Sequence, residues 1–173
     1  MNIRNQSEYR VYSLQIGKLL DQAGQTVSIA ESCTGGLLGH QITNSPGSSA
    51  YFRGGIIAYD NRIKVEKLGV DQKRLEKFGA VSEEVAKEMA KNVRQIFKTD
   101  YGVAITGIAG PDGGTKKKPV GLVFVAISNA RQTVCKKCQF FGARPKIKSQ
   151  AAHQALKLLF ESVRAFSERN FHG

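Results

Sequence analysis

Two short apolar runs constrain the fold of this chain more than any other feature of its sequence. Residues 26–30 are rich in β-branched side chains and have no polar face, and residues 119–127 are apolar on both faces. Both patterns are typical of central strands that helices cover on each side. We therefore expect a sheet with its centre buried, rather than a sheet with one face open to solvent.

The rest of the chain supplies alternating helices and strands. The clearest helix begins at Ser82, whose hydroxyl can cap free N–H groups, while Glu83 and Glu84 suit the positive end of the helix dipole. Its apolar stripe is expected at Val85, Ala86, Met89, Ala90, Val93, Ile96 and Phe97. Further helices are expected at residues 6–23 (apolar positions Tyr9, Tyr12, Ile16, Leu19, Leu20 and Ala23), 34–43, 61–68, 71–78 and 145–168, and further strands at residues 51–59, 101–105 and 132–141.

This order of elements predicts the fold class. Alternating helices and strands favour a parallel α/β sheet, whereas the short turn at residues 128–130 requires an antiparallel pair. The last strand is more polar and is expected near an edge, and the Gly54-Gly55 pair indicates a bulge or a close backbone approach. We expect an α/β protein, a three-layer α/β/α sandwich with a mixed, mostly parallel five-stranded sheet, as one domain over residues 1–173.

Composition limits the compartment and the partners. The chain shows no apolar stretch of the roughly 20 residues that span a bilayer, and its first residues do not resemble a signal peptide. Three cysteines, Cys33, Cys135 and Cys138, suit a reducing cytoplasm better than a disulfide scaffold. We expect a cytoplasmic protein without a membrane partner. The net charge of +12 favours anionic partners, from nucleic acid to a phosphorylated small molecule, although spread charge also describes an ordinary solvated surface.

Three loops are expected to meet at one edge of the sheet, where ligands bind in open α/β folds. They are Glu31 to Gly36, Tyr59 to Lys64 and the glycine-rich Thr106 to Gly114. The first places Ser32 at the start of a helix, where backbone amides can accept developing negative charge. The second holds Lys64, which could act as a base if burial or nearby cations such as Arg62 lowered its pKa. The alternative is that Ser32 caps a helix and Lys64 lies in solvent.

Other candidate groups carry weaker signals. Cys33 is a rival nucleophile, but no histidine lies near it in sequence. Cys135 and Cys138 would face opposite sides of a strand and have no second pair, so we expect no metal site. The glycine-rich stretch lacks the phosphate-loop and dinucleotide-binding patterns. Lys116 to Lys118 could hold a phosphate or lie in solvent, and Arg144 is a further candidate phosphate ligand.

Four segments together resemble the CinA C-terminal domain family, whose stand-alone members are nicotinamide-nucleotide amidases. The segments are AESCTGG at residues 30–36, GAVSEEVAKEMA at 79–90, TGIAGPDGG at 106–114 and KPVGLVFVAI at 118–127. They occur in the family's order, and the similarity covers about residues 7–165. The resemblance implies an α/β/α sandwich and a domain that commonly forms homo-oligomers.

The resemblance also implies a reaction and its residues. The expected enzyme is an amidohydrolase that deamidates nicotinamide mononucleotide to nicotinate mononucleotide and ammonia, without a metal or cofactor. Ser32 is implied as the nucleophile, Lys64 as the base, Tyr59 as a further catalytic residue and Arg144 as the phosphate ligand. We expect the oxyanion near the backbone amides of Cys33, Thr34, Gly35 and Gly36, and the nucleotide along Thr106, Gly107, Ala109 and Gly110.

Two positions depart from the family's pattern. Members usually carry a small hydroxyl residue in place of Asp60 and often an aspartate in place of Ala143. A carboxylate near Lys64 would raise the pKa of the lysine and weaken it as a base. The alternative function is a catalytically silent nucleotide- or DNA-binding module, which the family's competence-related name suggests.

Overall fold

The computed structural model describes residues 3–170, with side chains described for residues 11–166. Within them the sheet has five strands in the order β2-β1-β3-β4-β5. The strands are β1 (Val27–Glu31), β2 (Phe52–Ile57), β3 (Tyr101–Gly107), β4 (Leu122–Ser128) and β5 (Thr133–Gln139). The helices are α1 (Ile3–Gln22), α2 (Leu37–Thr43), the 3₁₀ turn η1 (Ser48–Ala50), α3 (Asn61–Glu66), α4 (Gln72–Phe78), α5 (Glu83–Phe97) and α6 (Arg144–Asn170).

The sheet is mixed, as predicted. Strand β1 pairs in parallel with both β2 and β3, whereas β4 pairs antiparallel with β3 and with β5. Four of these strands therefore run in one direction, and β4 alone is reversed. The neighbouring pairs are evenly divided, so "mostly parallel" holds for strand direction and not for strand pairing.

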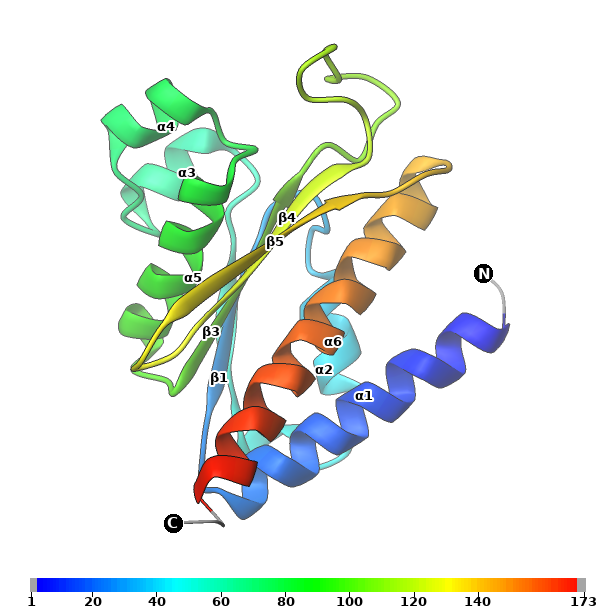
Figure 1. The fold of residues 1–173 in the computed structure, drawn as a ribbon, viewed down its shortest axis with the longest axis vertical. Helices are drawn as coiled ribbons and strands as arrows, with labels where there is room; N and C mark the ends of the chain where they lie inside the picture. The colour runs from blue at the N-terminus through cyan, green and yellow to red at the C-terminus, as the bar shows by residue number, and fades with distance from the viewer. Residues whose placement is uncertain (1–2, 171–173) are drawn as a thin grey trace.

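Helices cover both faces of the sheet, which gives the three layers seen in Figure 1. Helices α1, α2 and α6 lie on one face, and α3, α4 and α5 lie on the other. Two clusters of buried residues form the core, one on each face of the sheet. Successive side chains of β3 point to opposite faces, so Val103 and Ile105 belong to the first cluster and Ala104 belongs to the second. All seven residues of β4 are buried, which confirms its central position, while β5 is partly exposed at the edge.

Helix α5 packs closely on the sheet because the sheet offers it small residues. Gly102, Ala104 and Ala126 lie beneath it, and a Cβ on Gly102 would collide with the carbonyl oxygen of Ala90. Five of the predicted apolar positions of this helix are buried, but Ile96 is half exposed. Tyr9, expected on the apolar face of the first helix, lies outside the residues whose side chains are described.

Two predicted element starts are wrong for the same physical reason. The helix expected from residue 34 begins at Leu37, because Gly35 and Gly36 have φ of 61° and 98°, which a right-handed helix cannot contain. The strand expected from residue 119 begins at Leu122, directly after Gly121 with φ of 88°.

The Gly54-Gly55 pair shows both of the features that we gave as alternatives, a bulge and a close backbone approach. The β1–β2 register shifts there, and a Cβ on Gly55 would collide with Ile29.

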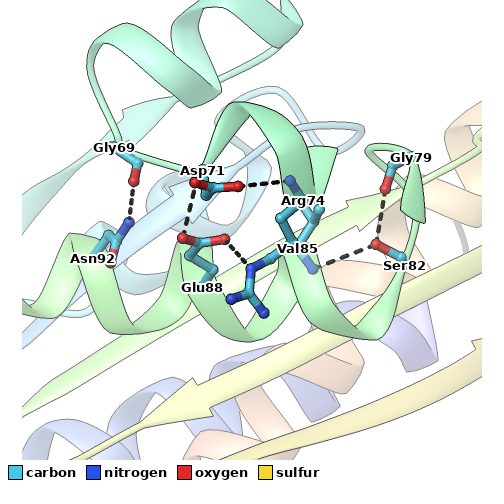
Figure 2. A network of polar contacts seen from close by, with 8 residues as sticks. All are labelled: Gly69, Asp71, Arg74, Gly79, Ser82, Val85, Glu88 and Asn92. Atoms are coloured by element: carbon cyan, nitrogen blue, oxygen red, sulfur yellow. Dashed lines mark hydrogen bonds and ion pairs between the residues drawn. The ribbon is translucent and has the colours of Figure 1, made fainter. Parts of the chain in front are cut away.

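A polar network joins helix α4 and the segments on either side of it to helix α5 (Figure 2). Ser82 caps α5, accepting a hydrogen bond from the Val85 amide and donating one to the Gly79 carbonyl oxygen. Glu88 accepts from the Asp71 amide and pairs with Arg74 at 3.0 Å. Helix α4 is thereby fixed against α5 by Glu88, and the bond from Ser82 to Gly79 holds the loop between them.

Candidate active site

The three loops predicted to meet do lie together, because β1, β2 and β3 end at the same edge of the sheet. They enclose a cavity of about 280 Å³. The predicted site residues that line it are Ser32, Cys33, Tyr59, Lys64, Thr106, Gly107, Ala109, Gly110 and Arg144. Thr34, Gly35 and Gly36, also predicted as substrate-binding residues, do not line the cavity.

Several lining residues carry no assignment from the sequence. They are Asn61, Ala80, Val81, Ile108, Asp112 and Gly113. Ala80 and Val81 come from the loop between α4 and α5, which is held by a 2.8 Å hydrogen bond from the Thr106 hydroxyl to the Ala80 carbonyl oxygen. Apolar side chains in a loop give no chemical signal in a sequence, so this wall is visible only in the structure.

Lys64 lies at the floor of the cavity and is almost fully buried, with 1% of its surface exposed. Its Nζ donates hydrogen bonds to the carbonyl oxygens of Ala58, at 2.8 Å, and Tyr59, at 3.3 Å. A neutral amine has two N–H bonds and one lone pair. With both N–H bonds committed to these carbonyls, the lone pair remains to accept a proton.

Burial shifts the protonation equilibrium of Lys64 toward this neutral form. Burial lowers the pKa of the amine below its ordinary value of 10.5, because a buried charge loses its hydration. Negative charge on Cys33 and on Asp60 acts in the opposite direction and raises that pKa. The sequence pointed to Arg62 as a neighbouring cation that could lower it, but Arg62 is turned into solvent and pairs with Asp60. Desolvation is the cause of the shift.

Ser32 follows the last residue of β1, and its backbone N–H donates to the Ile105 carbonyl oxygen of β3. This bond extends the sheet by one residue and fixes the serine at the cavity wall, where its side chain is 8% exposed. Within residues 3–170 the Ser32 hydroxyl has no hydrogen-bond partner, so it is not bonded to Lys64. Catalytic hydrogen bonds are often long before substrate binds, and the shared cavity keeps the pair together.

Glu31, directly before Ser32, occupies amides at the start of α2, among them the Gly36 amide that was expected to stabilise an oxyanion. Its carboxylate accepts hydrogen bonds from the backbone N–H groups of Gly36, Leu38 and Gly39, at 2.9 to 3.1 Å. The first turn of α2 is thus capped by a buried carboxylate from the preceding strand. The expectation is therefore wrong for the Gly36 amide, which is not free to bind a substrate.

Two amides of the turn remain for an oxyanion. The Gly35 amide donates to the Ser32 carbonyl oxygen, and the Gly36 amide donates to Glu31. In the described part of the chain, the amides of Cys33 and Thr34 make no hydrogen bond with another residue. Of the four residues expected at an oxyanion site, Cys33 and Thr34 therefore keep unbonded amides, and of these two only Cys33 lines the cavity.

Cys33 is a poor rival nucleophile. Burial, with a smaller contribution from the negative charge of Glu31, raises the pKa of its thiol to about 12, and the opposing effects of its own backbone amide, Lys148 and Lys64 are smaller. The reactive thiolate is therefore scarce at neutral pH.

Burial also raises the pKa of the Cys135 thiol to about 12. No cluster of three or more metal-ligating side chains occurs among the described residues.

Arg144, at the start of α6, connects two of the loops. Its Nη1 donates to the Gly110 carbonyl oxygen at 2.7 Å, and its Nη2 donates to the Tyr59 hydroxyl at 2.6 Å. A guanidinium has five N–H donors, so three remain for a ligand. Lys118 is committed elsewhere, because its Nζ donates to the Phe78 carbonyl oxygen at 2.6 Å.

Comparison with known protein families places this site in a known context. Residues 10–163 match the CinA C-terminal domain. The chain belongs to the CinA C-terminal domain family. A putative competence-damage inducible protein of Moorella thermoacetica is 51% identical over 152 residues, which are 88% of this chain and 37% of that protein. A CinA-like protein of Gloeothece citriformis is 60% identical over 114 residues, which are 66% of this chain and 27% of that protein.

Solved structures agree with the family assignment. The crystal structure of competence/damage inducible protein CihA from Agrobacterium tumefaciens has a TM-score of 0.88 and 34% identity, and the match covers 91% of this chain and 96% of that one. A CinA superfamily protein from Klebsiella pneumoniae has a TM-score of 0.87 at 27% identity, over 91% of this chain and 98% of that one. This CinA-family chain spans about a third of the length of the curated relatives it matches.

Asp60, which we expected to depart from the family's pattern, has a clear local role. Asp60 is the N-cap of α3, where its carboxylate accepts a 2.7 Å hydrogen bond from the Arg62 amide. That bond, together with the Arg62 side chain, lowers the pKa of Asp60 and keeps it ionised. The carboxylate raises the pKa of Lys64 as expected, but less than burial lowers it.

None of the helices within residues 3–170 combines the length and apolar character needed to cross a bilayer.

Proposed function

We propose that this domain hydrolyses the carboxamide of nicotinamide mononucleotide, releasing ammonia and nicotinate mononucleotide. The observation that carries the proposal is the buried amine of Lys64, which has both N–H bonds committed and shares one cavity with Ser32. Membership in the CinA C-terminal domain family supports it, because the stand-alone amidases that the sequence resembles belong to that family.

The first half of the reaction forms an acyl-enzyme. Lys64, neutral, takes the proton of the Ser32 hydroxyl, and the serine oxygen attacks the carbon of the carboxamide. The amide of Cys33, which lines the cavity, stabilises the oxyanion of the tetrahedral intermediate. Lys64 then gives its proton to the nitrogen, the C–N bond breaks, and ammonia leaves.

The second half regenerates the enzyme. Lys64 takes a proton from a water molecule, whose oxygen attacks the acyl carbon, and the bond to the Ser32 oxygen breaks as the serine recovers its proton. The products are a carboxylic acid and free Ser32. Arg144, with three N–H donors uncommitted, binds the phosphate of the nucleotide at the rim of the cavity. Tyr59, whose hydroxyl accepts from Arg144, holds that guanidinium in place.

The experiment that tests this function is a product analysis. The purified protein is incubated with nicotinamide mononucleotide from pH 6 to pH 10, and ammonia and nicotinate mononucleotide are quantified separately. The proposal predicts that both appear in equal amounts, and that ammonia appears more slowly from nicotinamide riboside, which lacks the phosphate and would give nicotinate riboside. Absence of ammonia over the whole pH range would overturn it.

The charge of the chain supports a second candidate, a nucleic-acid-binding module without turnover. The net charge of +12 exceeds what one phosphate requires, and Lys136 and Lys137 are exposed on the edge strand β5. Such binding would weaken steeply with salt, because the protein displaces counterions from the phosphate backbone. DNA binding that is salt-dependent and unchanged in Ser32→Ala, together with no ammonia release, would favour this candidate.

A further inference from the structure

The polar side chains that line the cavity fall into two sets. Lys64, Thr106 and Arg144 already donate hydrogen bonds to backbone carbonyls, and the Tyr59 hydroxyl accepts one from Arg144. Ser32, Asn61 and Asp112 form no hydrogen bond or ion pair with another residue in the described part of the chain. Ser32 is assigned as the nucleophile in the proposed function. Asp112 carries the single carboxylate that lines the cavity, and its role is open.

The residues that line the cavity become more exposed from its floor to its rim. Ser32 and Lys64, at the floor, are 8% and 1% exposed, whereas Tyr59 is 58% exposed, and Asn61, Asp112 and Arg144 are also exposed. A nucleotide whose carboxamide reaches Ser32 must therefore place its sugar and its phosphate at the rim. Arg144 takes the phosphate, since it is the rim cation. The sugar then faces the remaining rim groups.

Asp112 is held at the rim by tethers on both sides. On one side, Arg144 binds the carbonyl oxygen of Gly110 at 2.7 Å. On the other, the amide of Lys118 donates to the Thr115 hydroxyl, and the Lys118 ammonium is fixed to the Phe78 carbonyl oxygen. Both cations have other partners, and neither pairs with Asp112. The carboxylate is thus positioned by its loop and left available to a ligand.

We infer that Asp112 is a specificity residue that accepts hydrogen bonds from the vicinal hydroxyls of the substrate's ribose. A carboxylate accepts and does not donate, and its two oxygens match two neighbouring hydroxyl donors. An acidic residue recognises ribose hydroxyls in dinucleotide-binding folds by the same chemistry. A phosphate would be repelled by Asp112, and the carboxamide lies at the floor. This inference rests on the proposed function and narrows its substrate class to ribonucleotides with a free diol.

The test compares two substrates on four proteins. The substrates are nicotinamide mononucleotide and its 2′-deoxy analogue, which keeps the phosphate, the ring and its charge. The proteins are the wild type, Asp112→Ala, Asp112→Asn and the control Glu66→Ala. Glu66 is an exposed carboxylate of α3 that lies outside the cavity. Its removal changes the net charge by the same amount as the removal of Asp112, but leaves the cavity lining intact.

Loss of a charged hydrogen-bond partner is expected to lower kcat/KM of Asp112→Ala for the ribonucleotide by about tenfold, and for the deoxy analogue, which keeps only the 3′-hydroxyl, by clearly less. Asp112→Asn, which keeps one acceptor, is expected to fall between, and Glu66→Ala to match the wild type. An equal loss on both substrates, or no loss on either, would overturn the inference. An equal loss would instead assign Asp112 to the charged ring or to loop structure.

A binding measurement separates this inference from the proposed function. Calorimetry with the same two nucleotides and proteins reports discrimination of the diol without turnover. Binding that favours the ribonucleotide in the wild type but not in Asp112→Ala, with no ammonia release, would refute the amidase and keep the inference. Ammonia release without discrimination would refute the inference alone. If the wild type neither binds nor hydrolyses the nucleotide, both fail.

Discussion

Arg144 Nη2 donates a 2.6 Å hydrogen bond to the hydroxyl of Tyr59, although 85 positions separate the two residues in the sequence. The same guanidinium binds the glycine-rich loop through the Gly110 carbonyl oxygen. One side chain therefore connects the start of α6, the end of β2 and the loop after β3. Its planar fork can do this and still present donors to an anion.

The first prediction tests the planar guanidinium group of Arg144. Arg144→Lys keeps the charge but replaces a planar group by a single ammonium, which cannot reach both partners and a phosphate together. We expect KM for nicotinamide mononucleotide to rise about tenfold, with a smaller change for the riboside. Steady-state kinetics measure this, with Lys146→Ala on the same helix as the control. Equal KM values for Arg144→Lys and wild type would contradict the role of the fork.

The second prediction concerns the buried carboxylate of Glu31. Glu31→Ala leaves the amides of Gly36, Leu38 and Gly39 without their acceptor, so we expect a loss of about 3 kcal/mol in the free energy of unfolding. Urea denaturation measures the loss. Glu66→Ala, an exposed substitution, is expected to stay within about 0.5 kcal/mol of the wild type. Equal stability of the two variants would show that the cap of α2 contributes little.

The third prediction concerns pH. Lys64 must be neutral to act as a base, so kcat/KM should rise with pH through the pKa of Lys64 and then level off, below the ordinary lysine value of 10.5. Asp60→Ser keeps an N-cap for α3 and removes a charge that raises this pKa. The rise should therefore move to lower pH in the variant. A profile that is flat, or that moves to higher pH, would contradict the assignment of Lys64.

The fourth prediction concerns Cys33, which lines the cavity beside the proposed nucleophile. Because burial raises the pKa of its thiol to about 12, we expect no alkylation of Cys33 by iodoacetamide in the native protein at pH 8, and rapid alkylation in urea. Peptide mass spectrometry locates the label. Cys33→Ser should keep most of the activity, and a loss as large as that of Ser32→Ala would point to the thiol instead.

Much of the fold follows from local patterns. Residues 26–30 and 119–127 identify the buried strands because an unbroken apolar run suits only a strand covered on both sides. The Ser82 cap was predictable because its hydroxyl binds an amide only three residues away. The start of α2 was not, since the positive φ of Gly35 and Gly36 depends on how the turn meets Glu31.

The candidate site, like the fold, could be predicted from the sequence only in part. That Ser32, Lys64 and Thr106 line one cavity follows from parallel strands, whose carboxyl ends share an edge. The occupation of the α2 amides by Glu31 does not follow, because it depends on the path of the chain between residues 31 and 39. Nor does the wall at Ala80 and Val81, which a hydrogen bond from a distant strand holds in place.

The central claim is that Ser32 and Lys64 act as one catalytic pair, and ammonia release tests it most directly. We would measure the rate from nicotinamide mononucleotide for the wild type, Ser32→Ala, Lys64→Ala and the double variant, with circular dichroism to show that each is folded. Residues that act as a unit give non-additive losses, so each single variant should lose nearly as much activity as the double. Substantial ammonia release by folded Ser32→Ala, or by folded Lys64→Ala, would contradict the account.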